Sequence, residues 1–241
     1  MHCSRHDSGG PGCSSVGGGF LSELGPFFPT ADGTLQANNW AWSKSANVVF
    51  LDSPAYVGFS YSNSSADKVV GDARTAADAR AFLIGFLAKF PGFAASPLYI
   101  AGESYAGHYV PNLAAAILAG NAAASAHTPD KGYLNLKGIL VGNAWTDAAI
   151  DNYGAAEHWF SHYQISRSTF ESMSAACNFS NVGPIKAAGR AHSRLQDGVF
   201  AQKSRAPIDD CDVACDLAMD EMGCVPAAWI LQPACSCFGL T

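Results

Sequence analysis

The stretch from Asp72 to Phe90 carries apolar residues at helical spacing and predicts an amphipathic helix. Asp72 stands where a helix cap is expected, and Pro91-Gly92 follows the last apolar position and predicts the end of the helix. The apolar residues that define the periodicity are Ala79, Phe82, Leu83, Phe86, Leu87 and Phe90.

Shorter apolar runs predict strands. We expect buried strands over residues 47–51, 98–101 and 136–141, a helix over 110–118, and a polar, alanine-rich loop over 120–130. The order strand, helix, strand, helix, strand predicts a parallel sheet of the α/β class. After Asp151 the pattern becomes helical and rich in loops.

The composition of the chain is that of a globular protein. Of its 241 residues, 49% are hydrophobic and 14% are charged, which is enough apolar surface for a large core. The net charge is -6 and there is no basic run, so we expect no nucleic-acid partner. No apolar stretch approaches the roughly 20 residues that span a bilayer, so we expect no membrane partner.

The chain has eight cysteines, most of them towards the C-terminus, which predicts disulfides and an oxidising compartment. We expect a bridge from Cys177 to either Cys211 or Cys215, and the spacing leaves the choice open. Cys211 and Cys215 lack the second cysteine pair or the histidine pair of a zinc site. We therefore expect no metal, and no other cofactor.

The most informative run is 97–108, where an apolar, β-prone stretch meets a serine. Ser104 lies two positions after Gly102 and two before Ala106, and a helix-like segment follows. A sharp strand-to-helix turn needs small residues at those positions because the chain passes close to itself, so the run is typical of a nucleophile elbow. A glycine usually stands where Ala106 is. The plainer alternative is a serine that caps the next helix.

Residues 102–111, Gly-Glu-Ser-Tyr-Ala-Gly-His-Tyr-Val-Pro, resemble the nucleophile motif of the serine carboxypeptidases, an acid-acting branch of the α/β-hydrolases. Further blocks similar to family motifs occur in the family's order, and they are residues 8–15, 23–26, 58–62 and 141–143. The resemblance covers roughly residues 8–223.

The resemblance implies the fold class. We expect an α/β-hydrolase-type, mostly parallel sheet flanked by helices, incomplete, with a helical cap insertion. The implied domains are a partial hydrolase core with the nucleophile elbow over 1–150, a cap region over 151–223 and a divergent C-terminal tail over 224–241.

The resemblance also implies catalytic roles. Ser104 would be the nucleophile, which needs a histidine base oriented by a carboxylate because a serine hydroxyl alone is a poor nucleophile. The backbone N–H groups of Tyr105 and Gly10 would donate to the oxyanion. The alternative is that Gly10 belongs to an ordinary glycine-rich surface turn.

Two glutamates would recognise the substrate. The resemblance implies that Glu23 and Glu103 hydrogen-bond the C-terminal carboxylate of a peptide, with Ser8 where the family has an asparagine. An ionised glutamate repels a carboxylate, so we expect both to work protonated, which implies an acidic working pH. Glu23 as an exposed loop acid is the alternative. Tyr56 stands where the family commonly has glycine, and it either narrows the pocket or packs.

The implied reaction is hydrolysis of the last peptide bond of a peptide or protein through an acyl-enzyme on Ser104. A peptide C-terminus is therefore the expected partner. Two alternatives come from other classes: acyl transfer from sugar esters, and peptide binding without catalysis. Relatives that transfer acyl groups generally carry aspartate where Glu103 stands, so Glu103 favours the peptidase.

The resemblance implies that the catalytic aspartate and histidine follow the end of this chain. The candidates after Ser104 do not stand in a triad context; they are His108, His127, His158, His162, His192, Asp147, Asp151, Asp209, Asp210, Asp212, Asp216 and Asp220. A second chain that carries the aspartate and the histidine is therefore a hypothesis.

The start of the chain is not a signal peptide, because no apolar run follows Met1. The family's apolar strand before the glycine loop is also missing, and we expect a chain truncated at both ends. The resemblance implies a secreted, vacuolar or lysosomal protein. Two sequons predict N-glycosylation, at Asn63 and at Asn178.

Overall fold

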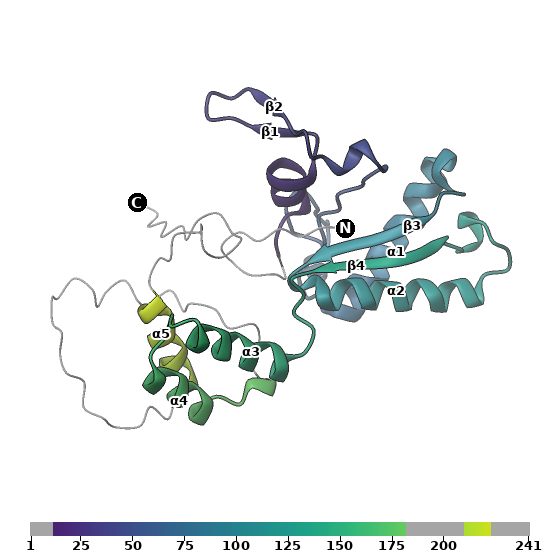
Figure 1. Ribbon diagram of the computed structural model, residues 1–241. Helices are drawn as coiled ribbons and strands as arrows, with labels where there is room; N and C mark the ends of the chain where they lie inside the picture. Colours follow the sequence, from purple (N-terminus) through teal and green to yellow (C-terminus); the bar gives the residue numbers. More distant parts are fainter. Residues whose placement is uncertain (1–11, 182–209, 223–241) are drawn as a thin grey trace. The chain divides into compact units, whose positions relative to one another are not determined.

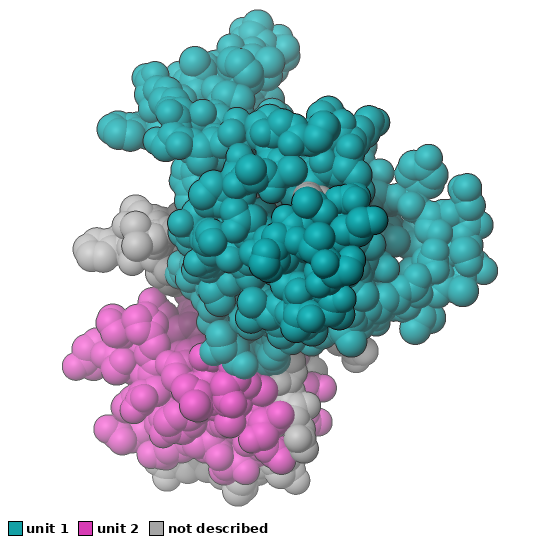
Figure 2. Space-filling view, turned by 90° about the vertical axis from the view of Figure 1, so that its right-hand side faces the viewer, with its two compact units in different colours: residues 1–146 teal, residues 147–241 magenta. Residues whose placement is uncertain are grey.

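The computed structural model describes residues 12–181 and 210–222 (Figure 1). The chain divides into two compact units, one that ends at Thr146 and one that begins at Asp147 (Figure 2). Within the described ranges, no helix combines the length and the apolar character needed to cross a membrane.

The first unit is built on a parallel pair of strands. Strand β3 (Leu98–Glu103) leads through helix α2 (Ala106–Ala123) to strand β4 (Leu136–Gly142). The strands pair in parallel from Leu98 opposite Leu136 to Glu103 opposite Gly142. This confirms the predicted strand–helix–strand unit, and it places the end of β3 beside the end of β4.

Two helices enclose the core of this unit. Helix α1 (Asp72–Lys89) packs against α2, and α2 packs against both strands (Figure 1). The apolar side chains between them are almost fully buried, among them Val110, Leu113, Ile117, Ile100 and Leu134. The burial of these side chains is the main driving force that holds β3 and its turn in place.

The helix boundaries differ from the predictions at specific residues. The N-cap of α1 is Gly71, and Asp72 is its first residue, where a carboxylate interacts favourably with the helix dipole. Helix α2 begins at Ala106 and not at residue 110, because its first turn grows directly out of the turn at Ser104. It also extends to Ala123, since alanine has the highest helix propensity and turns the start of the expected loop into helix.

The predicted strand over residues 47–51 is wrong. This stretch pairs with no strand among the described residues, and a strand requires the backbone of a neighbour. Its apolar side chains, Val49 and Leu51 among them, instead line an apolar groove of about 960 Å³ together with Phe82, Phe86 and residues of β3.

The remaining elements of the first unit are short. Strands β1 (Phe27–Pro29) and β2 (Leu35–Ala37) form an antiparallel hairpin. A π-helical segment, η1, covers Ser15–Leu24. Single 3₁₀ turns are η2 (Trp42–Lys44), η3 (Ser65–Lys68), η4 (Pro91–Phe93) and η5 (Pro129–Lys131).

The second unit is helical, as predicted for the chain after Asp151. It contains α3 (Ala148–Ser161), α4 (Arg167–Ala176), the 3₁₀ turn η6 (Phe179–Asn181) and α5 (Cys211–Met222). Its core is small and consists of Ala156, Ile165, Met173, Ala214 and Ala218.

Side-chain caps and one bridge stabilise these helices. The Asp147 carboxylate accepts from the N–H of Ile150 at 2.9 Å, and the Ser166 hydroxyl accepts from the N–H of Thr169 at 3.2 Å. A disulfide joins Cys177 to Cys211, the first of the two pairings that the sequence left open.

Candidate active site

Ser104 sits at the turn between β3 and α2 with a φ of 59°, in the left-handed region that side chains other than glycine rarely adopt. Its N–H donates to the carbonyl of Gly142 at 3.1 Å, which ties the turn to the end of β4. Its carbonyl accepts from the N–H groups of Gly107 at 3.0 Å and Trp145 at 2.9 Å. A strained backbone fixed from three sides is what a nucleophile elbow requires.

The small residues around the serine have identifiable neighbours. Gly102 and Ala106 are both buried, as expected for positions where the chain approaches itself. A third small residue also matters. A Cβ at Gly107 would lie 2.3 Å from the carbonyl oxygen of Trp145, so the first turn of α2 packs directly on the segment after β4.

Tyr105 is the N-cap of α2. Its N–H therefore stands at the end of the helix where backbone donors have no partner within the helix and the dipole attracts negative charge. Its ring stacks on Trp145, with centroids 5.7 Å apart and planes 17° apart. Its hydroxyl donates to Asp72 at 3.3 Å, and burial, followed by the charge of Asp72, raises the pKa of this hydroxyl.

Three comparisons bear on this geometry. A family model described as "Serine carboxypeptidase" matches residues 8–236. Two relatives from Arabidopsis thaliana are "Serine carboxypeptidase-like 28", 42% identical over 231 residues, and "Serine carboxypeptidase 24", 43% identical over 231 residues; each match covers 95% of this chain and 44% of the relative. The fold is similar to that of KEX1(delta)P, a prohormone-processing carboxypeptidase from Saccharomyces cerevisiae, with a TM-score of 0.64 and 26% identity over 89% of this chain and 43% of that chain.

The chain belongs to the serine carboxypeptidase family. The predicted fold class is confirmed, because the structural neighbour is a carboxypeptidase and the parallel pair with its helices forms an incomplete α/β fold of that type. The chain spans less than half the length of the curated relatives that it matches.

The carboxypeptidase residues expected to bind the substrate carboxylate lie in different parts of the first unit. Glu103 is the last residue of β3, half-buried and next to Ser104. Glu23 is half-buried near the end of η1. The amide of the buried Asn38 donates to the carbonyls of Glu23 at 3.1 Å and Gly25 at 2.9 Å, and so fixes the backbone around Glu23. Two further expected residues, Ser8 and Gly10, lie outside the described residues.

Asp52 is an anchor that the sequence reasoning did not single out. Its side chain is buried and accepts from the Ser14 hydroxyl at 2.8 Å, the Val16 N–H at 3.0 Å and the Phe59 N–H at 2.9 Å. Burial raises its pKa, but the donors outweigh that effect and the pKa lies below its usual value. The ionised carboxylate thus joins the start of η1 to the loop that follows residue 53. A lone acid between Leu51 and a Ser-Pro pair was the only sequence signal.

Tyr56 does not line the pocket next to this loop. An open pocket of about 400 Å³ is lined by residues 51–55, 59–61 and part of α1. The Tyr56 hydroxyl points elsewhere and donates to the carbonyls of Ser62 at 3.0 Å and Ser64 at 2.8 Å. The hydroxyl therefore holds the loop after Phe59, which agrees with the packing alternative for Tyr56.

Ser104 donates to no histidine among the described residues. His108 packs against the rings of Tyr105 and Trp145, with centroids 5.1 and 4.9 Å away, and His127 packs on Tyr133 at 4.6 Å. These histidines of the first unit thus have contacts typical of packing, and neither is hydrogen-bonded to Ser104.

The remaining candidate bases and acids lie in the second unit. The ring of His158 on α3 and the ring of His162, the C-cap residue of α3, are tilted against each other with centroids 3.8 Å apart. Asp147 caps α3, and the Asp210 carboxylate accepts from the N–H of Asp212 at 2.9 Å at the start of α5. Two candidates, His192 and Asp209, lie outside the described residues.

Both predicted glycosylation sites are accessible. Asn63 is exposed in the loop before η3, and Asn178 is exposed after α4. The Asn178 side-chain oxygen accepts from the N–H of Ser180 at 3.2 Å. Glycosylation itself stays a prediction at both positions.

Proposed function

We propose that this chain is the nucleophile-bearing part of a serine-type carboxypeptidase that removes the C-terminal residue of peptides. The observation that carries the proposal is the backbone of Ser104. A serine held at a φ of 59° at the end of a parallel strand and before a helix presents its hydroxyl at the edge of the sheet. Family membership supplies the reaction class.

In the proposed reaction the Ser104 hydroxyl attacks the carbonyl carbon of the last peptide bond. The N–H of Tyr105, with that of Gly10 as second donor, would stabilise the negative charge on the tetrahedral intermediate. The start of α2 supports this role, because its dipole favours an anion there. Loss of the amine gives an acyl-enzyme on Ser104, which water then hydrolyses.

Glu103 and Glu23 would select a free C-terminus. A protonated carboxyl donates a hydrogen bond to the substrate carboxylate, whereas an ionised one repels it. Ser8 would add a single hydroxyl donor.

The base and its aspartate are proposed to come from sequence outside this chain. The chain covers 44% of its relatives, and Ser104 has no histidine partner among the described residues. Either a continuation of the chain or a second polypeptide would supply both groups. Without them only the oxyanion donors and binding remain, which leaves a rate enhancement on the order of 10³-fold.

The test measures release of the C-terminal amino acid from an N-blocked dipeptide at acidic pH. We expect the chain alone to give at most slow turnover, at a similar rate in Ser104→Ala, because the residual rate comes from the oxyanion donors and binding. Addition of the C-terminal half of the relative "Serine carboxypeptidase 24" should raise Ser104-dependent turnover. Rapid turnover by the chain alone would contradict the proposed origin of the base.

A second candidate function is peptide binding without catalysis, favoured because the Ser104 hydroxyl is not hydrogen-bonded to a histidine within residues 12–181 and 210–222. Binding of the blocked dipeptide that is unchanged in Ser104→Ala, with no turnover after addition of the second half, would support it. Turnover of an acyl-glucose in preference to the dipeptide would instead indicate acyl transfer.

We also propose a secreted or vacuolar location. The disulfide between Cys177 and Cys211 and the two exposed sequons support an oxidising compartment.

A further inference from the structure

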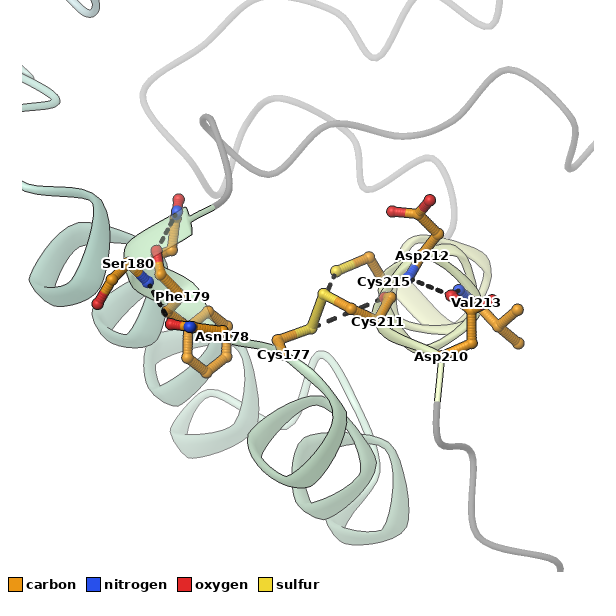
Figure 3. Close-up of a disulfide and its surroundings, with 10 residues drawn as sticks. Cys177, Asn178, Phe179, Ser180, Asp210, Cys211, Asp212, Val213 and Cys215 are labelled. Carbon is orange, nitrogen blue, oxygen red and sulfur yellow. Dashed lines mark hydrogen bonds between the residues drawn. A yellow bond between two sulfur atoms is a disulfide. The ribbon is translucent and has the colours of Figure 1, made fainter.

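Three cysteine sulfurs meet where α4 ends and α5 begins (Figure 3). Cys177, the C-cap residue of α4, is bonded to Cys211, the first residue of α5. Cys215 carries a thiol, and its Sγ lies 3.9 Å from the Sγ of Cys177, close to van der Waals contact. All three sulfurs lie within 4.8 Å of one another.

The helix explains why two cysteines compete for one partner. Cys211 and Cys215 are four residues apart in α5, and residues four apart lie on the same face of a helix, one turn from each other. Both side chains therefore point towards Cys177, as Figure 3 shows.

We propose that Cys215 exchanges with the disulfide, so that Cys177 is bonded to Cys211 in one form of the protein and to Cys215 in the other. The Cys215 thiolate attacks the Sγ of Cys177, a new bond forms between these two sulfurs, and the bond from Cys177 to Cys211 breaks. Cys211 leaves as a thiolate and takes up the proton that Cys215 lost. One disulfide and one thiol are present before and after, so no oxidant or reductant is needed.

The surrounding contacts hold the two helices together in both forms. Ala214 and Ala218 of α5 are fully buried in a core shared with Met173 of α4. At the other end of α5, the Glu221 carboxylate accepts from the hydroxyls of Ser166 at 2.9 Å and Thr169 at 2.6 Å. The N–H of Cys177 donates to the carbonyl of Met173 at 2.9 Å, which fixes the shared sulfur. Exchange thus requires no separation of α5 from α4.

The burial of Cys215 and the charges around it set the rate of the disulfide exchange. Burial, followed by the charges of Asp212 and Asp216, raises the pKa of the Cys215 thiol. The charged residues of α4, Arg167 and Glu171, lie 3.9 Å apart at the surface and pair with each other. A small thiolate fraction slows the attack at acidic pH and leaves it effective at mildly alkaline pH, because the thiolate is the attacking species.

The same three sulfurs also meet the distance requirement of a soft-metal site. A metal needs all three as thiolates, whereas exchange uses the disulfide and the thiol that the structure contains. The exchange is therefore the chemistry that the observed bonding supports.

The experiment maps the thiols of the full chain after incubation at mildly alkaline pH. The protein is quenched in acid, denatured, alkylated with N-ethylmaleimide and digested with trypsin and Asp-N, which cuts before Asp212 and so separates Cys211 from Cys215. We expect alkylated Cys211 and alkylated Cys215 in amounts of the same order, and cross-linked peptides of both pairings. Label on Cys215 with none on Cys211 would overturn the proposal.

Two variants make the test independent of the wild-type equilibrium. Cys211→Ser, refolded with oxidised glutathione as the oxidant, should form the bond from Cys177 to Cys215 quantitatively. Cys215→Ser is the matched control and should contain only the bond from Cys177 to Cys211. A folded Cys211→Ser protein in which Cys177 and Cys215 are both alkylated would also overturn the exchange. If that variant does not fold, the thiol map of the wild type decides.

Discussion

Ser104 has a left-handed backbone conformation, which glycine adopts without strain and serine adopts only at an energetic cost. The left-handed region costs a residue with a Cβ about 1 kcal/mol or more, and the three backbone hydrogen bonds of the turn maintain it. We predict that Ser104→Gly unfolds at higher urea concentration than Ser104→Ala, by about 1 kcal/mol in the free energy of unfolding. Equal stabilities would mean that the turn is not strained.

At Gly107 we predict that adding a side chain destabilises the protein. A Cβ at this position would collide with the Trp145 carbonyl, and overpacking of this kind costs about 1–3 kcal/mol. Gly107→Ala should therefore lower the urea midpoint. Gly85→Ala is the matched control, because Gly85 is also inside a helix, α1, and a Cβ there meets nothing within 4 Å. The control should be stabilised by about 0.5–1 kcal/mol. Destabilisation of both variants by the same amount would contradict the close approach.

Asp52 should make stability depend on pH. Its pKa in the folded protein lies below the unfolded value, so its contribution is complete above about pH 4 and is lost as the pH falls through the folded pKa. We expect Asp52→Asn to lower the free energy of unfolding by about 2 kcal/mol near neutral pH. The difference from wild type should shrink at pH values below about 4.

Urea unfolding of the wild type and of Asp52→Asn at both pH values checks this. Asp78→Asn serves as the control because Asp78 is largely exposed on α1, where it pairs with Arg74 at 3.5 Å. It should change stability little at either pH. A pH-independent loss in Asp52→Asn would show that the donors are not bound to an ionised carboxylate.

At the scale of elements, the local pattern of apolar residues was sufficient to predict a helix or strand wherever neighbours in the sequence are also neighbours in space. The runs 98–101 and 136–141 are short, apolar and bounded by turn residues, and both are strands. The run 47–51 has the same local pattern and pairs with nothing among the described residues, because pairing depends on a distant strand. Ser104 was recognisable for the same local reason.

The supporting residues of the site could not be predicted in this way. The Asp52 carboxylate accepts a hydrogen bond from the N–H of Val16, 36 positions earlier in the chain. The N–H of Trp145 donates to the carbonyl of Ser104, and a backbone N–H gives no signal in the sequence. Asn38 holds the chain near Glu23 from 15 positions away. These contacts exist only once the fold has formed.

The contact of α5 with α4 offers a test at this scale. Glu221 accepts hydrogen bonds from Ser166 and Thr169, at the start of α4. Glu221→Ala should lower the free energy of unfolding of the second unit by about 1 kcal/mol, since charged acceptors form the stronger hydrogen bonds. Glu171→Ala, at an exposed pair with Arg167, should leave it nearly unchanged. Thermal unfolding followed by circular dichroism distinguishes the two, and equal effects would contradict the assigned contact.

At the scale of the whole molecule, the parallel pair leaves apolar surface exposed. Ile139, Leu140 and Val141 of β4 are 44%, 47% and 37% exposed, and β4 pairs only with β3 among the described residues. A strand edge of this kind promotes association with other chains.

We therefore predict that the isolated chain self-associates and that Ile139→Lys reduces the association, because a charge at an edge opposes strand pairing. Light scattering against protein concentration measures this. Ile139→Leu, which keeps the apolar surface, should associate like the wild type. A monodisperse wild-type chain would show that this surface is covered.

The close packing of α2 on Trp145 also restricts how the gene can vary. Every single-nucleotide change that replaces glycine with another amino acid gives a residue with a Cβ, and no such residue fits at Gly107 unless the Trp145 carbonyl moves. Gly85 has no such restriction. Drift at Gly107 thus requires a prior shift of a segment almost forty residues away in the sequence, so the order in which mutations arise would matter as much as their identity.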